Sequence, residues 1–388
     1  MAKLIEITGK VLSGEWGTDD ESGNGIPVLR TTNFTNEGIV DYSNVVTRTI
    51  QKKNIDAKYL RKGDIIIEKS GGSDKQPVGR VIYFDGPEST YLFNNFTGLL
   101  RVKNQAVWLP RYVFYSLFHN YRKGGTRPFE SKTTGLHNLK TDDYISRYEV
   151  LEAPISEQQS ICKQLDYVYD IIKTRQQQLQ KLDELVKARF VELFGDPLTN
   201  PKGYQEKYLS EIAEYWNGLT YKPDDVANEG TIVLRSSNIQ NASLDFADTV
   251  RVNCKIGTKK YVQDNDILMC SRNGSAKLVG KVALIKELSE PMSFGAFMMI
   301  IRSAYYPFLM TYFQLPAFRS QITTGATTTI NQITGRMLDN VKLAIPDIES
   351  AKDFSAFTNQ VDKSKVAVQK SLDEAQLLFD SLMQQYFG

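Results

Sequence analysis

The chain has 388 residues, of which 41% are hydrophobic and 24% are charged, and its formal net charge is +2. This composition is typical of a soluble protein of two or three domains. No run of 18 apolar residues occurs and the N-terminal sequence does not resemble a secretory signal, so we expect neither a membrane-spanning helix nor export. The three cysteines form no Cys-x-x-Cys pair, which argues against a disulfide framework or a structural zinc site and favours the cytoplasm.

Two seven-residue stretches of the sequence are nearly identical. Residues 28–34 read VLRTTNF, and residues 233–239 read VLRSSNI. The substitutions keep hydroxyl or apolar character. We interpret this repeat as framework, with Val28, Leu29, Val233 and Leu234 buried.

Further landmarks recur in the same order around these two stretches. The first copy contains YLRKGDII at 59–66, VGRV at 78–81, the segment 133–156 and Phe194-Gly195. The second copy contains YVQDNDIL at 261–268, VGKV at 279–282, the segment 327–350 and Phe387-Gly388. The spacing between copies changes only from 205 to about 192 residues. The chain is therefore a tandem duplication of a unit of roughly 195 residues.

The first part of each unit predicts a mixed α and β domain. Short β-rich runs such as DIIIEKS, GRVIYF and TGLLRVK are separated by Gly, Asn and Pro. A helix is predicted at 110–121, where Pro110 occupies the first turn. We assign residues 1–155 and 196–347 to two such domains, and the fold class to α+β.

Residues 156–195 and 348–388 each predict one long helix. Between residues 157 and 193 there is no Gly or Pro, and apolar residues recur at steps of three, four and seven. The apolar positions are Ile161, Leu165, Val168, Ile172, Leu179, Leu182, Val186 and Leu193 in the first helix, and Phe354, Phe357, Val361, Val368, Leu372, Ala375, Phe379, Leu382 and Tyr386 in the second. The expected N-terminal capping pairs are Ser156 with Gln159 and Ser350 with Asp353.

A helix of this length with one narrow apolar stripe needs a partner helix. We expect the two helices to pack as an antiparallel coiled coil, which would hold the two domains about 50 Å apart as pseudo-symmetric copies. The alternative is that each helix folds back on its own domain.

Basic and small polar residues gather at matching places in the two copies. Residues 101–140 carry eight Lys or Arg against one acid, and residues 291–338 carry three Arg and no acid. A solvated surface explains one such stretch, whereas two at matching places favour a polyanionic partner. In the first copy the candidate DNA-contacting residues are Arg30, Lys69, Ser70, Ser73, Lys75, Arg122, Lys123, Arg127, Lys132, Thr133, His137 and Asn138. In the second copy they are Arg235, Ser271, Arg272, Asn273, Ser275, Lys277, Thr328 and Asn331. Arg30 and Arg235 are either structural or placed on a phosphate.

Sequence signatures of catalysis are missing. There is no phosphate-binding loop, no dinucleotide-binding glycine pattern and no HExxH, and the chain has only two histidines, of which we expect His119 to be structural. The stretch PDIESAK at 346–352 is interpreted as a helix cap and not as a nuclease motif.

Two similar domains held apart by a helical spacer suit a DNA duplex, whose structure repeats every 34–36 Å. The competing interpretation is a coiled-coil scaffold for protein partners, and a duplicated enzyme would need a catalytic set in both halves.

In the order and duplication of these landmarks, the chain resembles the specificity (S) subunit of Type I restriction–modification systems. The resemblance covers the whole chain and rests on VLR-[ST]-[ST]-N, the Asp-Ile strands, Pro154 and Pro346 at the helix entries, and the Phe-Gly helix ends. It implies two target recognition domains that each read half of a split DNA site, with the helices setting the gap. It also implies docking of two methyltransferase subunits and a restriction subunit. S-adenosylmethionine, Mg and ATP would belong to those partners, and this chain would hold no cofactor or metal and would not be an enzyme.

Overall fold

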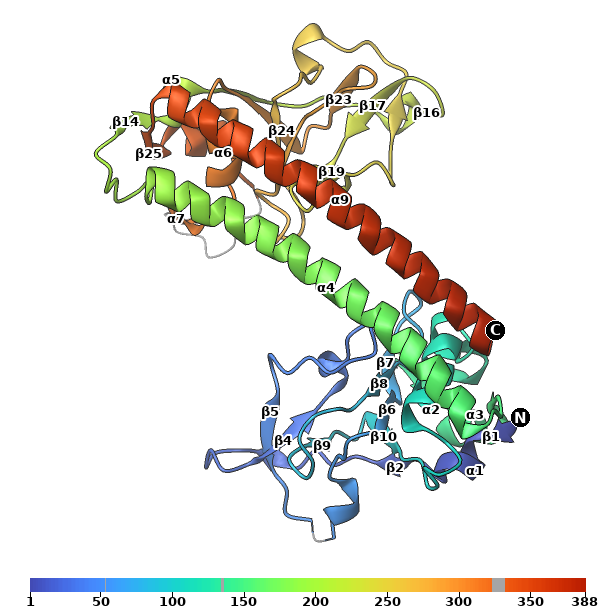
Figure 1. Cartoon of the computed structure of the whole chain (residues 1–388). Helices are drawn as coiled ribbons and strands as arrows, with labels where there is room; N and C mark the ends of the chain where they lie inside the picture. The colour runs from blue at the N-terminus through green and yellow to red at the C-terminus, as the bar shows by residue number, and fades with distance from the viewer. Residues whose placement is uncertain (53, 134–135, 323–331) are drawn as a thin grey trace. The chain divides into compact units, whose positions relative to one another are not determined.

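The computed structural model describes residues 1–52, 54–133, 136–322 and 332–388. The chain divides into two compact units, of which unit 1 comprises Met1–Arg175 with Ser371–Gly388, and unit 2 comprises Gln176–Lys370. Both long helices, α4 (Ile155–Phe194) and α9 (Ile348–Phe387), contribute one half to each unit (Figure 1). Each of these helices has 40 residues, and their bounds agree with the predicted ranges to within one residue.

The described residues of unit 1 form four sheets. Their strand orders are β2-β10-β6-β8, β3-β5-β4-β9, β11-β12-β7 and β1-β13. The strands are β1 (Ala2–Lys3), β2 (Leu12–Ser13), β3 (Thr18–Asp19), β4 (Ile26–Leu29), β5 (Val46–Thr49), β6 (Ile65–Glu68), β7 (Ser70–Gly72), β8 (Val81–Tyr83), β9 (Leu92–Phe93), β10 (Thr97–Leu100), β11 (Glu130–Thr133), β12 (Leu136–Leu139) and β13 (Glu149–Val150). The helices are α1 (Leu4–Thr8), α2 (Pro110–Arg122) and α3 (Thr141–Arg147), with short 3-10 turns η1 (Thr31–Asn33), η2 (Asp56–Lys58) and η3 (Arg127–Phe129).

Unit 2 repeats both four-stranded sheets and one two-stranded sheet of unit 1. Its strand orders are β15-β24-β21-β22, β16-β20-β17-β23, β14-β25 and β18-β19. The strands are β14 (Gln205–Tyr208), β15 (Glu214–Asn217), β16 (Val226–Ala227), β17 (Thr231–Leu234), β18 (Ile239–Gln240), β19 (Ser243–Leu244), β20 (Arg251–Val252), β21 (Ile267–Cys270), β22 (Val282–Leu284), β23 (Met292–Phe294), β24 (Met298–Arg302) and β25 (Lys342–Ile345). The helices are α5 (Leu209–Ile212), α6 (Tyr306–Tyr312), α7 (Pro316–Ile322) and α8 (Gly335–Asp339), with 3-10 turns η4 (Pro223–Asp225), η5 (Ser236–Asn238) and η6 (Thr258–Lys260).

Matching strands of the two units pair in the same way, which confirms the duplication at the level of topology. The repeated heptapeptide supplies the last two residues of β4 and of β17 and the 3-10 turn that follows each strand. Each of these strands pairs in parallel with the strand before a turn, β9 or β23. The Asp-Ile segments form the central strands β6 and β21, each antiparallel to β10 or β24. The helix predicted at 110–121 is α2, and Pro110 is its first residue.

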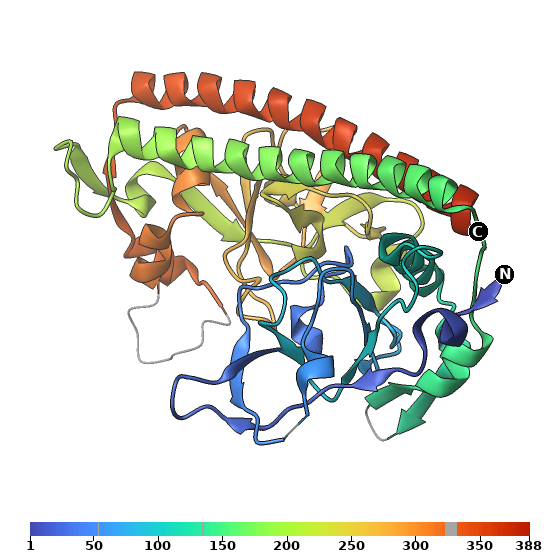
Figure 2. The ribbon, with the colours of Figure 1, turned by 60° about the horizontal axis from the view of Figure 1, so that its bottom comes forward.

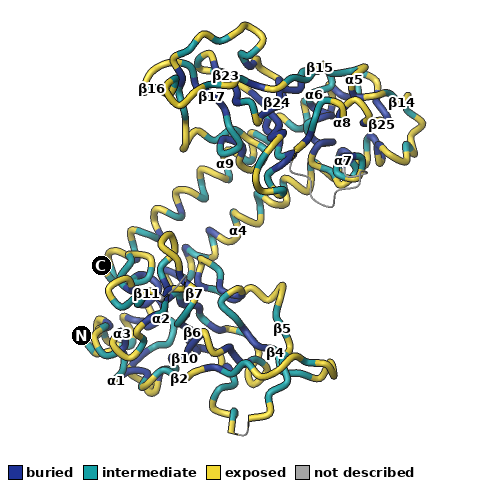
Figure 3. Tube along the Cα trace, turned by 180° about the vertical axis from the view of Figure 1, so that it is seen from behind, coloured by how far each residue is buried: buried dark blue, intermediate teal, exposed yellow. Residues whose placement is uncertain are grey.

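The central strand of each unit is buried on both faces, and it therefore reads as an unbroken apolar run. Ile65 and Ile67 of β6 enter the core cluster that also contains the α2 side chains, and Ile66 enters the cluster between the sheets. In unit 2, Ile267 and Leu268 divide in the same way. Alternate side chains of a strand point to opposite faces, so one run of three supplies two cores. All four residues of β6 and of β21 are buried, whereas Figure 3 shows many outer loops of both units as exposed.

Within each unit the two long helices lie side by side and run antiparallel (Figure 2). In unit 1, the Tyr386 hydroxyl donates to Gln164 at 3.0 Å, and Arg175 donates to the Ser371 hydroxyl at 3.1 Å. In unit 2, Phe190 of α4 packs on Phe354 of α9, with ring centroids 5.7 Å apart. The expected pairing of the two helices is therefore confirmed. Each helix half also packs on the domain of its own unit, which was the alternative arrangement, so both contacts are present.

Both predicted capping pairs are wrong. The first helix begins at Ile155, so Ser156 lies inside the first turn, where the carbonyl of Pro154 accepts from the amides of residues 157 and 158. The second helix is capped by Asp347, whose carboxylate accepts from the amide and the hydroxyl of Ser350, both at 2.8 Å. The interpretation of PDIESAK as a helix cap is confirmed, with Asp347 as the capping residue.

Candidate nucleic-acid interface

The repeated heptapeptide builds the same corner in both units. Val28 and Leu29 are fully buried, as are Val233 and Leu234, which confirms the predicted framework role. After the strand, Asn33 accepts from the Arg30 amide at 2.9 Å and donates to the carbonyls of Asp41 and Asn44. The second copy repeats these bonds with Asn238, Arg235, Asp245 and Asp248. The asparagine shared by the two copies is thus a buried side chain that links three backbone segments.

The two arginines of the heptapeptide are held partly in place. Arg30 donates through Nη2 to the Asn44 carbonyl at 3.3 Å, and Arg235 donates through Nη2 to the Asp248 carboxylate at 2.8 Å. The Nε atom of both arginines is buried and has no hydrogen-bond partner among the described residues. This fits the structural role and leaves a cationic group at the end of β4 and β17.

The first polar loop (residues 69–77) is more ordered than the predicted loop, because Ser70–Gly72 form strand β7. This strand pairs with β12, and β12 pairs with β11, so the loop and the hairpin share one three-stranded sheet. Asn138 lies opposite Ser70, and His137 lies opposite Gly72. The structure therefore brings together the two groups of candidates that the sequence placed about 60 residues apart. The side chain of Thr133 lies outside the described residues.

Acidic residues neutralise part of this surface. Lys132 forms an ion pair with Asp74, and the bond from Lys132 holds the Asp74 pKa below its usual value, with His137 and Arg127 contributing. His137 lies with Nδ1 3.1 Å from Glu130 and Nε2 3.6 Å from Asp74. Lys132, His137 and Arg127 thus surround one carboxylate at the tip of the first polar loop.

Two further lysines belong to this loop. Burial, and then the nearby Lys58, lowers the Lys69 pKa, and the Lys69 ammonium donates to the Ser13 hydroxyl at 2.9 Å. Lys75 is exposed, whereas Ser73 closes a turn by donating from its amide to the Gln76 carbonyl at 2.7 Å.

The second polar loop (residues 271–277) starts from the same backbone bonds as the first, since the amides of Ser271 and Arg272 donate to the Phe297 carbonyl, but its side chains differ. Arg272 is bridged to Gln332, and its guanidinium lies 5.4 Å from the centroid of the Phe297 ring. Asn273 donates to the Ser236 hydroxyl at 3.2 Å and accepts from the Ser275 amide at 3.0 Å. The remaining candidates stand as follows: Ser271 is buried, Lys277 is exposed, and Thr328 and Asn331 lie outside the described residues.

Several cations of the basic stretch at 101–140 have internal partners. Arg122 pairs with Asp380 of α9 at 2.6 Å, so the structure places this candidate against the long helix and not beside the polar loop. Arg101 and Arg111 pair with Asp64 and Asp166. Lys123 and Arg127 remain exposed near the end of α2. The number of unpaired positive charges on this stretch is therefore smaller than its eight Lys and Arg suggest.

Sequence reasoning missed one element of this surface. Phe96 and Phe297 are large, exposed and at equivalent positions. The carbonyl of each accepts hydrogen bonds from the first amides of the polar loop of its unit. The signal was present as FNNF at 93–96 and FGAF at 294–297, which is a further repeated pattern.

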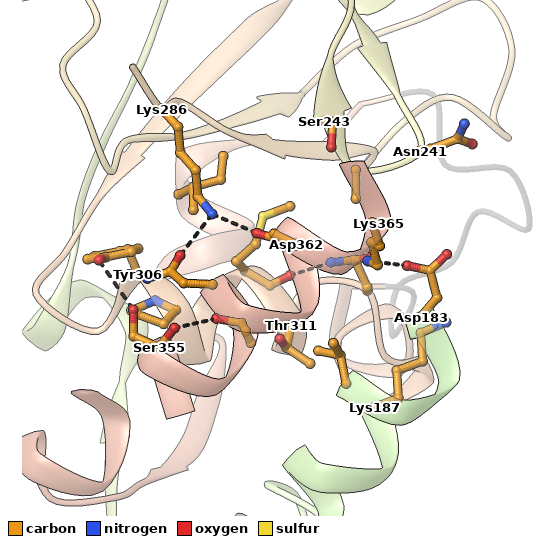
Figure 4. A pocket seen from close by; sticks show the side chains of 18 residues that line it. Asp183, Lys187, Asn241, Ser243, Lys286, Tyr306, Thr311, Ser355, Asp362 and Lys365 are labelled. Atoms are coloured by element: carbon orange, nitrogen blue, oxygen red, sulfur yellow. Dashed lines mark hydrogen bonds and ion pairs between the residues drawn. The ribbon is translucent and has the colours of Figure 1, made fainter. Parts of the chain in front are cut away.

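Unit 2 also contains a cavity of about 290 Å³ between α4, α6, α9 and the β18–β19 turn (Figure 4). Lys286 reaches across it to Asp362 at 2.7 Å and to Asn359 at 3.1 Å. Lys365 pairs with Asp183 at 2.5 Å. These charges neutralise one another. The Lys286–Asp362 pair ties α9 to the domain, and the Lys365–Asp183 pair ties α9 to α4.

The described residues carry little that resembles an enzyme site. No group of three His, Cys, Asp or Glu among them could hold a metal ion. Burial raises the Cys162 pKa to about 12, so this thiol stays protonated and is a poor nucleophile. His119 is buried in α2, as expected for a structural histidine. None of the helices in the described ranges is long and apolar enough to cross a membrane.

The fold and this surface define a class of protein: a duplicated chain that presents two related polar loops on one scaffold and shares two long helices between its units. The chain belongs to the family of Type I restriction modification DNA specificity domains, whose sequence profile matches residues 2–184 and 201–375. It is therefore a DNA-recognition subunit of a Type I restriction–modification system, and this function is favoured over the protein scaffold.

Individual proteins are similar to the chain in sequence or in fold. The chain is 22% identical to the Type I restriction enzyme EcoKI specificity subunit of Escherichia coli K12 over 387 residues, covering 92% of this chain and 80% of the relative. Its fold is similar to that of the S subunit from M. genitalium, with a TM-score of 0.57, 14% identity, and coverage of 100% of this chain and 95% of that chain. It is also similar to a chain from a structural study of complex assembly and conformational transition in the type I R-M system, with a TM-score of 0.53, 15% identity, and coverage of 100% and 96%.

Proposed function

We propose that each unit reads one half of a split, asymmetric DNA site, and that α4 and α9 fix the number of unread base pairs between the halves. One observation carries this proposal. The two polar loops start from the same strand register, but their side chains differ at equivalent positions. Lys69 and Ser70 of unit 1 correspond to Ser271 and Arg272 of unit 2.

Different side chains at equivalent starting positions suit the reading of different bases. An arginine such as Arg272 can bind guanine through two hydrogen bonds, and Asn138 can do the same with adenine. Lys69, Lys75, Lys123, Lys132 and Lys277 suit phosphate contacts, which set the register without reading sequence. Arg30 and Arg235 are the equivalent cations in both units and suit the same phosphate role.

The remaining parts of the system belong to other chains in this proposal. Two methyltransferase subunits dock on the helices and neighbouring surfaces and bind S-adenosylmethionine, and a restriction subunit joins with ATP and Mg. This chain contributes recognition and no catalysis, and it acts in the cytoplasm. The neutral, buried Cys162 and the structural His119 support a non-catalytic role.

The test is methylation mapping of DNA from cells that express the methyltransferase subunits with or without this chain. We expect methylated adenines in a split motif of fixed gap only when the chain is present. The purified complex should also lose DNA affinity steeply between about 50 and 200 mM salt, because phosphate contacts release counterions. Unchanged methylation together with salt-independent binding would favour the protein scaffold.

A further inference from the structure

An exposed phenylalanine stands at the same place in each unit. Phe96 is 49% exposed and Phe297 is 60% exposed. A single exposed apolar residue is common on protein surfaces and needs no explanation. Recurrence at one position in two units whose neighbouring loops differ does need one.

The turns that carry these residues have the same geometry. The Thr97 amide donates to the Asn94 carbonyl at 3.1 Å, and the Met298 amide donates to the Gly295 carbonyl at 2.8 Å. Each phenylalanine is therefore the third residue of a four-residue turn, between β9 and β10 or between β23 and β24. The repeated heptapeptide anchors both turns, since Leu29 and Leu234 each accept from the first residue of the turn at 2.9 Å.

Each phenylalanine is also fixed to the beginning of its polar loop. The Phe96 carbonyl accepts from the amides of Lys69 and Ser70 at 2.8 and 3.2 Å. The Phe297 carbonyl accepts from the amides of Ser271 and Arg272, both at 3.0 Å, and from the Ser271 hydroxyl at 2.9 Å. These bonds involve only the backbone of the phenylalanine, so they persist whatever side chain the turn carries.

A cationic side chain belongs to the loop start that each phenylalanine carbonyl holds, and in unit 2 it lies beside the ring. In unit 2 the Arg272 guanidinium lies 5.4 Å from the Phe297 ring centroid. In unit 1 the half-buried Lys69 begins next to the Phe96 carbonyl and bonds Ser13. A ring without a hydrogen-bonding group cannot read base edges by polar contacts, but it can press against the face of a base while the neighbouring cation holds a phosphate.

We propose that Phe96 and Phe297 are wedge residues, each of which inserts its ring against a base step in the half-site of its own unit and locally unstacks the duplex. The inference rests on the proposed function and adds an apolar contact to it. Unstacking at each half-site also makes it easier to extract a target base, which DNA methyltransferases must take out of the stack.

The test uses the complex with its methyltransferase subunits and a duplex that carries the mapped site, with 2-aminopurine in one half or the other. We expect Phe96→Ala and Phe297→Ala each to weaken site-specific binding about ten-fold, the effect of losing one aromatic stack. Each variant should also abolish the 2-aminopurine fluorescence increase in one half-site only. Phe96→Trp and Phe297→Trp should restore both signals, because a flat ring is kept.

Matched controls separate the wedge from general surface effects. Val107 and Val226 are 51% and 48% exposed apolar residues of unit 1 and unit 2. Val107→Ala and Val226→Ala should leave affinity and fluorescence unchanged. Phe96→Ala and Phe297→Ala should leave the slope of affinity against salt unchanged, because neither removes a phosphate contact, whereas Lys75→Ala should reduce it.

Three results would overturn the wedge. If the wild-type complex reads its site and both alanine variants bind and fluoresce like it, the wedge is wrong and the proposed function stands. If the alanine variants lose their methyltransferase subunits during purification, the phenylalanines are protein contacts. If the wild-type complex shows no site-specific binding, the wedge and the proposed function both fail.

Discussion

A buried aspartate holds the same position in each unit. Asp64 accepts from Arg101 at 2.7 and 2.6 Å, and Asp266 accepts from Arg302 at 2.6 and 2.8 Å. Both carboxylates are almost completely buried. The repeated Asp-Ile dipeptide therefore marks a buried ion pair at the beginning of each central strand.

Removing the arginine should destabilise its unit strongly. Arg101→Met leaves the Asp64 carboxylate buried without its charged partner, which costs about 3 kcal/mol of unfolding free energy or more. Urea denaturation followed by circular dichroism measures this change. The exposed control Lys123→Met should change stability little, and an equal, small effect of both variants would contradict the account.

The buried histidine predicts a pH dependence of stability. Burial lowers the His119 pKa, and Lys123 and Arg122 lower it further, whereas Asp380 opposes them. The folded pKa is therefore below the unfolded value of about 6.5, so the unfolded chain binds the proton first as pH falls. The contribution of neutral His119 to stability is complete above the unfolded pKa and is lost as pH falls through the folded pKa.

His119→Gln should remove this part of the pH dependence. We expect the difference in melting temperature between pH 8 and pH 5.5 to be smaller in the variant than in the wild type. The same loss of melting temperature in both proteins would show that other groups account for it.

At the scale of elements, Phe190 links three helices of unit 2. Its ring lies 4.9 Å from that of Phe308 on α6 and 5.7 Å from that of Phe354 on α9, and it is fully buried. The heptad pattern did not include Phe190, because a strict seven-residue repeat drifts around a straight α-helix. By contrast, Leu165 and Val168 were predicted and are buried.

Phe190→Ala should leave a cavity at this junction and destabilise unit 2 by about 4 kcal/mol. The neighbouring residue Val191 is 53% exposed, so Val191→Ala is the matched control and should change stability little. Thermal or urea denaturation of both variants provides the comparison. A loss of less than about 1 kcal/mol for Phe190→Ala would contradict the packing described here.

The length of the helix pair should set the unread gap. Inserting seven residues after Arg175 in α4 and after Lys370 in α9 lengthens both helices by about 10 Å, or about three base pairs. Methylation mapping should show both half-sites unchanged and the gap wider by about that number. An unchanged gap would exclude the helices as the spacer.

At the scale of the whole molecule, the sequence predicted the features that repeat. Duplication, the buried valine and leucine of the repeated heptapeptide and the two paired helices follow from order and periodicity, which one sequence displays directly. It could not predict that Ser70–Gly72 join the hairpin as a strand, because that pairing is non-local. It also could not predict that Asp380 neutralises Arg122, since the two lie 258 positions apart in the chain. The exposed phenylalanines were missed because exposure is a property of the folded surface.

If each unit reads its own half of the site, a substitution in one unit should change one half of the methylated motif. Methylation mapping of variants that are substituted in one unit only measures this. Arg272→Gln changes the second polar loop, and Asn138→Ala changes the strand beside the first polar loop. We predict that each variant relaxes or alters one half of the motif and leaves the other half and the gap unchanged. Altered specificity in both halves from either variant, or none from both, would contradict it.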